Sequence, residues 1–388
     1  MAVKKSPLLP IFLIVLVDIL GYTIMIPLLP FYAERFGAGP FAVGFLLASY
    51  GFCQMLAGPV LGRISDQVGR RPVLLVSQIG TFAGFLLLAF AHDLRLIFAA
   101  RIIDGLTAGN LSVAQAYIAD VTEPQKRTKA FGIIGISFGL GFLIGPAISG
   151  LLAHYGHQYP ILAAAFLSAL SILFTFFLLP QKENIQTDPK GWFDFSVYGK
   201  SFRDPDLSPY LQQFLSFIFS FSVFIAGFAL FAERRFIFDG HPFGAREVGY
   251  VFAYVGLLGV LTQVFLLGPL VKMMGEKKMV RAGFILISGS FFALAFVHSV
   301  PLLLLTLTTS FVGSSILRPS LTSVITQRAG KNGQGSVLGV TQSLMSISQV
   351  AAPILSGALI QQGHLSMWAF MGSLVCAFGV ILSFSYKK

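Results

Sequence analysis

The stretch GRISDQVGRR, residues 62–71, is a compact cluster of charged residues and glycines between two long apolar segments. Its pattern of glycines and charges recurs about 206 positions later in GPLVKMMGEK, residues 268–277. A second set of landmarks recurs at an offset of 207, where Gly132, Pro146 and Gly150 are matched by Gly339, Pro353 and Gly357. Repeated landmarks in two halves that are both rich in membrane-length apolar segments are typical of a duplicated transporter.

The composition is that of a protein whose surface largely faces lipid. Hydrophobic residues make up 55% of the 388 residues and charged residues only 11%, whereas a soluble domain carries about 25% charged residues. The formal net charge of +11 is compatible with nucleic-acid binding, but the positions of the basic residues argue against that class. The two cysteines, Cys53 and Cys376, lie inside apolar runs, and no spacing of Cys or His predicts a metal site.

Twelve apolar stretches are long enough to cross a bilayer, which requires about 20 residues in a helix. They lie near residues 8–32, 41–61, 72–91, 94–118, 128–153, 158–180, 208–232, 246–270, 278–298, 300–326, 335–361 and 364–385. One long polar interval separates six stretches from six. We therefore expect an all-helical membrane protein with a six-helix bundle over residues 1–180, a cytoplasmic linker over 181–207 and a second six-helix bundle over 208–388.

The basic residues predict the orientation in the membrane. If the N-terminus lies inside, most of the 27 Lys and Arg residues fall in segments on the inner side. This distribution predicts that both termini face the cytoplasm and that the number of spans is even. The N-terminal segment has a basic start but no small-residue cleavage site, so we interpret it as a retained first span. The compact loops fit a bacterial inner membrane.

The cluster at residues 62–71 resembles the signature G-x-x-x-D-x-x-G-R-[RK] of the major facilitator superfamily. The matching residues are Gly62, Asp66, Gly69, Arg70 and Arg71. The glycines allow close packing and a tight turn, the aspartate can accept hydrogen bonds at helix N-termini, and the arginines can grip carboxylates. The resemblance implies that the cluster latches the two halves in the outward-facing state, with Asp120 as an ionic partner. A basic loop that only sets topology is the alternative.

Residues 132–150, GIIGISFGLGFLIGPAISG, resemble the antiporter motif of the same family, G-x8-G-x3-G-P-x2-G-G. The matching residues are Gly132, Gly141, Gly145, Pro146 and Gly150, with Ser149 in place of one glycine. Small residues four positions apart form a flat face for helix contact, and a proline within a span favours a bend. Ordinary helix packing is the alternative interpretation. In the second half, Ser348 and Ala352 occupy the positions that match Gly141 and Gly145.

Residues 101–110, RIIDGLTAGN, resemble the proton-linked motif R-x-x-Q-G of the family, with Asp104 where Gln is usual. Together, the three motifs most resemble the twelve-span drug/proton antiporters, in particular the tetracycline-exporter branch. The resemblance covers essentially the whole chain, with the specific motifs confined to spans two to five. It implies two pseudo-symmetric six-helix bundles that work by alternating access.

Asp18 lies near the midpoint of the first span, where a charge costs about 2.5–3.5 kcal/mol. Tyr22 follows one turn later on the same helix face. Because protonation removes the charge, Asp18 is a candidate proton carrier. A structural hydrogen bond to a neighbouring helix is the alternative.

Arg101 and Asp104 lie three residues apart in the fourth span and can meet on one helix turn. Either they form a self-neutralised structural ion pair, or Arg101 modulates the protonation of Asp104. The second-half positions that match Asp18, Arg101 and Asp104 carry apolar or hydroxyl residues. We therefore expect ion coupling in the first half and apolar substrate contacts in the second.

Further candidates for substrate contact are aromatic and polar residues within the spans. Four phenylalanines, Phe217, Phe221, Phe224 and Phe228, form a stripe along the seventh span, which serves either packing and lipid contact or a drug pocket. Arg318 either binds an anionic group or makes a structural contact. The complete set of candidate substrate contacts is Tyr22, Gln54, Asn110, Gln115, Phe217, Phe221, Tyr254, Arg318 and Gln342.

The function that we expect is proton-coupled antiport that exports small amphipathic compounds. Such a carrier works as a monomer in the lipid bilayer, needs no cofactor or metal besides the proton gradient, and binds no nucleic acid. The alternative is a symporter or uniporter for an endogenous metabolite or organic anion, with Arg101 and Arg318 on the substrate. The sequence has no GxxxxGK[ST] loop and no Ser/His, paired Asp or HExxH constellation within a span, so neither direct ATP use nor enzymatic catalysis is expected.

Overall fold

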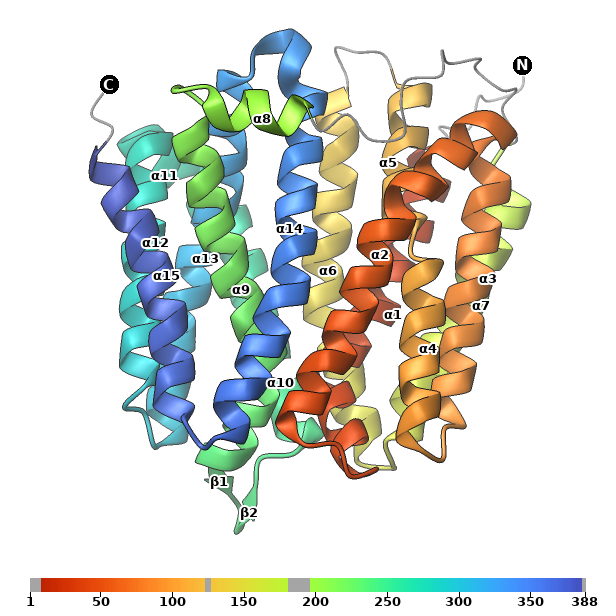
Figure 1. The fold of residues 1–388 in the computed structure, drawn as a ribbon, viewed down its shortest axis with the longest axis vertical. Helices are drawn as coiled ribbons and strands as arrows, with labels where there is room; N and C mark the ends of the chain where they lie inside the picture. The colour runs from red at the N-terminus through yellow and green to blue at the C-terminus, as the bar shows by residue number, and fades with distance from the viewer. Residues whose placement is uncertain (1–7, 123–126, 181–195, 386–388) are drawn as a thin grey trace. The chain divides into compact units, whose positions relative to one another are not determined.

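The computed structural model describes residues 8–122, 127–180 and 196–385, which are almost entirely helical (Figure 1). The first half contains α1 (Leu8–Glu34), α2 (Pro40–Val68), α3 (Arg70–Ala89), α4 (Leu94–Leu106), α5 (Asn110–Val121), α6 (Arg127–Ala153) and α7 (Gln158–Leu178). The second half contains α8 (Ser196–Arg203), α9 (Ser208–Arg235), β1 (Ile237–Phe238), β2 (His241–Pro242), α10 (Ala245–Leu261), the π-helical segment η2 (Thr262–Leu266), α11 (Leu267–Met274), α12 (Glu276–Leu294), α13 (Val300–Arg328), α14 (Gly330–Gln361) and α15 (Leu365–Ser385).

Contacts divide the chain into two compact units. Unit 1 comprises Met1–Gly37, Ser49–Trp192 and Ala245–Ala253, and unit 2 comprises Ala38–Ala48, Phe193–Gly244 and Tyr254–Lys388. Each unit therefore contains one helical bundle and the first turns of a helix that continues in the other unit. These first turns belong to α2 and α10, the second spans of the two halves.

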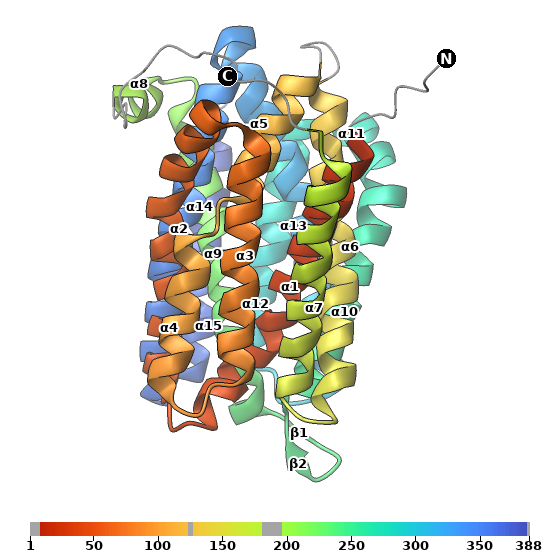
Figure 2. The ribbon, with the colours of Figure 1, turned by 90° about the vertical axis from the view of Figure 1, so that its right-hand side faces the viewer.

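The two units use the same helix packing. In unit 1, α1 packs against α5, α6 and α7, and α3 packs against α4, α5 and α7 (Figure 2). In unit 2, α9 packs against α13, α14 and α15, and α12 packs against α13 and α15. Each of these contacts of α9 and α12 thus has its counterpart in a contact of α1 or α3. The predicted all-helical fold of two pseudo-symmetric six-helix bundles is confirmed.

One of the twelve expected spans, α12, is less apolar than the others. Eleven helical segments in the described parts of the chain are long and apolar enough to cross a membrane. The expected ninth span, α12, has only 19 residues, and its first six include Glu276, Lys277, Lys278 and Arg281. These charges shorten the apolar part of α12, so it is not among the eleven. It nevertheless occupies the same place in its bundle as α3 and completes the expected twelve.

Two spans depart from a continuous α-helix. The fourth span breaks at Thr107–Gly109, between α4 and α5, and a Cβ on Gly109 would lie 2.7 Å from Leu61 Cδ1 of α2. Glycine therefore permits a close approach to α2 at this break. The eighth span contains the π-helical segment Thr262–Leu266, a feature often found at functional sites.

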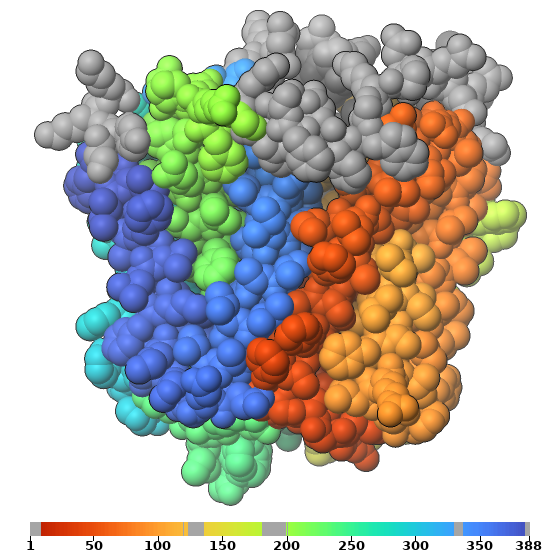
Figure 3. Space-filling view, viewed as in Figure 1, coloured from red at the N-terminus to blue at the C-terminus, as the bar shows by residue number. Residues whose placement is uncertain are grey.

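Apolar side chains cover the outer helix faces, as a lipid environment requires. Phe177 of α7 is 72% exposed and Leu374 of α15 is 70% exposed. Figure 3 shows α4 in orange and α15 in dark blue at the surfaces of their respective units. Among the eleven helical segments that are long and apolar enough to cross a membrane, α9 is the most buried.

Candidate functional site

The charged cluster at the start of α3 surrounds one arginine. The guanidinium of Arg70 forms an ion pair with Asp66, four residues earlier, and its Nε lies 2.8 Å from Asp120 Oδ2 of α5. Its Nη1 also donates to Ser65 Oγ over 2.7 Å and to the carbonyl of Gly62. Arg70 thus links the end of α2, the start of α3 and the end of α5 within unit 1.

The glycines of this cluster have different structural roles. Gly69 precedes α3 with φ at 98°, a backbone conformation that favours glycine, and Gly275 precedes α12 with φ at 74°. By contrast, no described atom lies within 4 Å of a Cβ built on Gly62 or Gly268. The turn therefore explains the second glycine of each repeat, and the structure gives no steric reason for the first.

An arginine near the start of α3 and another in α12 hold the last helix of their bundle. Arg71 donates to the carbonyl of Phe176 in α7, and its guanidinium lies 5.4 Å from the centre of the Phe176 ring. In unit 2, Arg281 donates to the carbonyl of Ser383 in α15 and lies 3.9 Å from the centre of the Phe384 ring. We call the end of each bundle that carries these residues its basic end.

At the helix junction that matches Arg70, the second half has hydrogen bonds in place of an ion pair. Glu276, at the start of α12, accepts from Ser323 Oγ at 2.6 Å and from Gln327 Nε2 at 3.0 Å, both on α13. Glu276 occupies the position that matches Arg70. The same helix junction therefore centres on a basic residue in unit 1 and on an acidic residue in unit 2.

The antiporter motif forms the face of α6 that receives α1. A Cβ on Gly141 would overlap the side chain of Ile19, and one on Gly145 would overlap Thr23 Oγ1. Thr23 Oγ1 in turn donates to the carbonyl of Gly141 over 2.9 Å. Small residues at 141 and 145 are therefore needed for this close helix contact.

The ends of the motif have different surroundings. Pro146 lies within α6, and a Cβ on Gly150 would lie 3.4 Å from the Cα of Gly249 in the first turns of α10. Gly132 also lies in α6, and its surroundings fall outside the described residues.

Arg101 and Asp104 form a buried ion pair on α4. Arg101 Nη1 lies 3.1 Å from Asp104 Oδ2, and the two residues are 4% and 5% exposed. The rings of Tyr50 and Phe85 flank the guanidinium at 5.8 Å and 5.6 Å from their centres. The predicted pairing on one helix turn is therefore present, and aromatic faces cover the remaining positive charge.

Asp18 lies in a different set of contacts. Its carboxylate makes hydrogen bonds with the side chains of Ser171 on α7 and Asn110 on α5. Its Oδ2 is buried and has no hydrogen-bond partner among the described residues, although the residue as a whole is partly exposed. No basic group of the described chain lies within ion-pair distance of Asp18. Asp18 is thus a carboxylate held by neutral donors.

Tyr50 connects several of the predicted residues and was missed by the sequence analysis. Its ring stacks on Tyr22 with centroids 6.1 Å apart, and its hydroxyl accepts from Gln54 Nε2 at 3.3 Å. The same ring faces Arg101. Its position one turn before Gln54 on α2 was the available signal. Tyr22 and Gln54 therefore belong to one cluster beside the ion pair.

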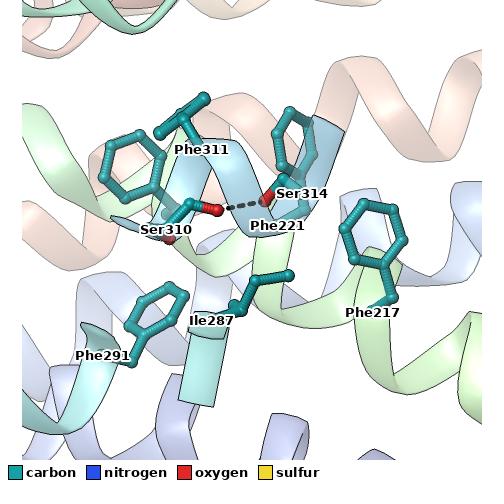
Figure 4. A pocket seen from close by; sticks show the side chains of 8 residues that line it. Phe217, Phe221, Ile287, Phe291, Ser310, Phe311 and Ser314 are labelled. Atoms are coloured by element: carbon teal, nitrogen blue, oxygen red, sulfur yellow. Dashed lines mark hydrogen bonds between the residues drawn. The ribbon is translucent and has the colours of Figure 1, made fainter. Parts of the chain in front are cut away.

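The predicted phenylalanine stripe is part of the interior of unit 2. Phe217, Phe224 and Phe228 are at most 3% exposed, which contradicts lipid contact for these three. Phe217, Phe221 and Phe224 line a small cavity together with Ile287, Phe291, Ser310, Phe311 and Ser314. In Figure 4 these side chains converge from α9, α12 and α13. The cavity has a volume of about 10 Å³, space for about one water molecule.

The remaining predicted contacts are dispersed. Tyr254 on α10 shares a hydrogen bond of 2.7 Å with Thr308 on α13. Arg318 is half-buried in α13, Gln115 is half-buried in α5, and Gln342 is exposed on α14. These residues therefore lie on four different helices, α5, α10, α13 and α14. The described residues contain no group of three or more His, Cys, Asp or Glu side chains that can hold a metal.

Comparison with known proteins identifies the family. The chain matches the family model of the Major Facilitator Superfamily over residues 11–353. It is 33% identical over 368 residues to the class B tetracycline resistance protein of Escherichia coli, with 92% of this chain and 88% of that protein covered. It is 28% identical over 393 residues to multidrug resistance protein 2 of Bacillus subtilis (strain 168), with 97% and 96% covered.

A solved structure shows the same fold. The human organic anion transporter MFSD10 (TETRAN) aligns with a TM-score of 0.74 and 22% identity, covering 99% of this chain and 100% of that chain. The repeated six-helix packing and these similarities show that the chain is a multi-span membrane transporter and belongs to the Major Facilitator Superfamily.

Proposed function

We propose that this transporter is a proton-coupled antiporter that exports small amphipathic compounds by alternating access. The observation that carries the proposal is the position of Asp18, a carboxylate within α1 that neutral donors hold and that lacks a basic partner in the described chain. Tetracycline and multidrug resistance proteins among its relatives support this substrate class. The cell membrane of a bacterium, with both termini in the cytoplasm, is the location that fits the basic residues.

Asp18 is better suited than Asp104 to load and release a proton. Protonation of Asp104 would leave Arg101 without its carboxylate partner in a buried site, which is costly. Protonation of Asp18 instead removes a charge that no basic group in the described part of the chain offsets. In the proposed cycle, Asp18 takes a proton from outside, its neutral form permits the inward-facing state, and loss of the proton to the cytoplasm accompanies substrate capture.

The Arg101–Asp104 pair then has a supporting role. Asp18 lies close enough to Asp104 for their charges to interact, and Arg101 offsets the charge of Asp104. The pair therefore limits the repulsion that an ionised Asp18 meets. We infer that three residues of the charged cluster at the start of α3 serve as the conformational latch between the two halves. They are Asp66, Arg70 and Asp120.

The substrate is expected to combine a polar edge with apolar rings. Tyr22, Tyr50 and Gln54 offer aromatic and hydrogen-bonding groups in unit 1. The phenylalanines of α9 offer an apolar lining in unit 2. Because the cavity among them has space for about one water molecule, a bound ring would require the phenylalanine side chains to move apart.

A carrier for organic anions is the second candidate. It requires arginines that can reach a substrate carboxylate. In Arg101, Nη1 pairs with Asp104 and two aromatic rings flank the guanidinium, so a second carboxylate would have to share this arginine with Asp104. Arg318, half-buried in α13, is the residue that we assign to this role. Inhibition by anionic competitors that disappears in Arg318→Gln would favour this candidate over drug export.

The test uses the purified full-length chain in lipid vesicles. Uptake of cationic, neutral and anionic compounds, tetracycline among them, is measured at two external pH values with and without a pH gradient. Dissipating the gradient should abolish accumulation of the substrate. Asp18→Asn should uncouple substrate movement from proton movement. Asp93→Asn is the matched control, because Asp93 caps α4 by accepting from Leu96 N and asparagine caps equally well. Flux that is indifferent to the gradient and to Asp18→Asn would overturn the proposal.

A further inference from the structure

One face of α7 is a row of buried hydroxyls that the functional assignments above leave without a role. Ser168 is 4% exposed, and Ser171 and Thr175 are completely buried. The spacing of three and four residues places all three on the same side of the helix. This side faces α3, where Gln78 is also completely buried. We call these four residues the α7 polar row.

The α7 polar row is joined to Asp18 by hydrogen bonds. Gln78 Nε2 donates to Ser171 Oγ over 2.8 Å, and Ser168 Oγ donates to the carbonyl of Gln78 over 3.3 Å. The Ser171 side chain also makes a hydrogen bond with the Asp18 carboxylate. A continuous polar connection therefore runs from α1 through α7 to α3 inside unit 1.

The row points toward the basic end of unit 1. Thr175 lies three residues before the end of α7, about 4.5 Å along the helix axis. The next residue, Phe176, receives the hydrogen bond from Arg71 at the start of α3. Thr175 is therefore one turn closer than Ser171 to the end of the bundle that carries Arg70 and Arg71.

Several oxygens along this line lack hydrogen-bond partners. Asp18 Oδ2, Gln78 Oε1 and Thr175 Oγ1 are buried and without a partner among the described residues. Buried polar oxygens are costly when they are unpaired, and proteins usually satisfy them with ordered water. Hydrogen bonds between α3 and α7 account for Ser168, Ser171 and the Gln78 amide nitrogen, but they leave the three unpaired oxygens without a structural role.

We infer that the α7 polar row is the route by which Asp18 exchanges its proton with the basic end of unit 1. This inference rests on the proposed proton coupling. The proton of Asp18 passes to Ser171 Oγ while the proton of the Ser171 hydroxyl passes to a bridging water, and the same exchange continues at Thr175 toward solvent. Each hydroxyl or water oxygen along the route gains one proton and loses one, and Asp18, which only loses its proton, is left ionised.

This route is separate from the substrate cluster of unit 1. Tyr22, Tyr50 and the ion pair involve α1, α2 and α4, whereas the row lies between α3 and α7. Apolar residues at the basic end, among them Ile14, Leu74 and Leu179, form a buried cluster. They would restrict free water and make the rate depend on the hydroxyls.

The test compares two substitutions at one position in the full-length chain in vesicles. Thr175→Val keeps the shape and removes the hydroxyl, whereas Thr175→Ser keeps the hydroxyl. A trapped pH-sensitive dye reports proton movement during gradient-driven uptake, and substrate counterflow reports movement without net proton transfer. The rate of gradient-driven proton movement divided by the rate of counterflow should fall roughly tenfold or more in Thr175→Val. In Thr175→Ser this ratio should stay near the wild-type value.

A kinetic signature and a control sharpen this test. The solvent deuterium isotope effect on driven uptake should increase in Thr175→Val and in Ser171→Ala, because proton transfer becomes limiting. Thr306→Val is the matched control, since Thr306 Oγ1 donates only within its own helix α13, to Leu302. It should leave the ratio unchanged.

The outcomes separate this inference from the proposed function. If the wild-type protein moves no protons with any compound, the proposed coupling fails. If the wild-type protein is coupled and Thr175→Val matches it, the route is wrong and the coupling stands. A parallel loss of counterflow and driven uptake in Thr175→Val, without a change in isotope effect, would show a structural role and overturn the inference.

Discussion

The two bundles share their helix packing and differ in what they bury. Unit 1 surrounds a carboxylate, an ion pair and the α7 polar row. Unit 2 surrounds phenylalanines, and Phe224 occupies the position that matches Asp18. Duplication has therefore preserved the contacts between helices while the interior chemistry diverged. This divergence supports the proposed division between proton handling in unit 1 and apolar substrate contact in unit 2.

The recurring glycines explain which contacts were preserved. In unit 1, a Cβ on Gly150 would lie 3.0 Å from the carbonyl oxygen of Arg246. In unit 2, a Cβ on Gly357 would overlap the carbonyl oxygen of Pro40. Arg246 and Pro40 are themselves equivalent in the repeat. The same close approach of a helix to a backbone carbonyl therefore occurs once in each unit.

A second close approach of a glycine to a backbone carbonyl also occurs once in each unit. A Cβ on Gly249 would lie 2.9 Å from the carbonyl oxygen of Pro146, and one on Gly44 would overlap the carbonyl oxygen of Pro353. Pro146 with Gly150, and Pro353 with Gly357, thus mark one helix crossing that is built twice.

The largest expected effect concerns the buried Arg101–Asp104 ion pair of unit 1. Arg101→Leu leaves Asp104 buried without its partner and should lower the free energy of unfolding by about 3–5 kcal/mol. The double variant Arg101→Leu with Asp104→Leu should recover most of this loss. Unfolding of the purified protein in mixed micelles, titrated with denaturing detergent, measures both. A single variant as stable as the double variant would show that unit 1 does not depend on charge pairing.

The repeated glycine contacts should be unequal in strength. Gly44→Ala and Gly357→Ala place a methyl group on a backbone carbonyl and should cost about 1–3 kcal/mol in unfolding free energy. Gly150→Ala, at 3.0 Å, should cost less. The matched controls are Gly62→Ala and Gly268→Ala, whose Cβ would meet no described atom within 4 Å.

The same unfolding titration separates these variants. The control substitutions lie in helices, so they should be neutral or slightly stabilising. Equal losses at Gly44 and Gly62 would contradict the steric explanation of the repeat.

The two basic ends should differ in their response to salt. Arg70→Gln removes the arginine between Asp66 and Asp120 and should cost about 1 kcal/mol at low ionic strength, less in salt, because the cluster is partly exposed. Glu276→Gln retains an oxygen that can accept from Ser323, so it should cost less and respond little to salt. Thermal unfolding at two salt concentrations compares them. A salt-independent loss in Arg70→Gln would refute the ionic interpretation.

The sequence predicted the fold well because its signals were strong and periodic. Membrane-length apolar stretches, the basic residues and the repeat at 206–207 each constrain the same arrangement. The break at Thr107–Gly109 and the π-helical segment at Thr262–Leu266 escaped prediction, since both depend on how neighbouring helices pack. Hydropathy alone does not contain that information.

The candidate site was predicted only in part. Arg101 with Asp104 and Arg70 with Asp120 are pairs that charge and spacing suggest, and the structure brings both together. Tyr50 and the α7 polar row were not found, because a tyrosine or serine within a span is common. Their contacts with other helices distinguish them, and these contacts come from tertiary structure.

The smallest expected effect concerns the two histidines that precede the last helix of each bundle. His157 and His364 are separated by the repeat offset. His157 is half-buried with its ring 6.4 Å from that of Tyr32, whereas His364 is exposed. Partial burial, and secondly the charge of Arg35, hold the pKa of His157 below its usual value. A lowered pKa means that the folded protein binds this proton less readily than the unfolded chain does.

Stability should therefore decline as the pH falls below about 6.5, the ordinary histidine value, and the loss should be complete below the lowered pKa of His157. His157→Gln should remove this component, a few tenths of a kcal/mol in a partly exposed site. His364→Gln is the matched control and should leave the acid-side decline unchanged. Thermal unfolding between pH 5 and pH 8 compares the two variants. An equal change in both would mean that burial beside Tyr32 and Arg35 does not distinguish the two positions.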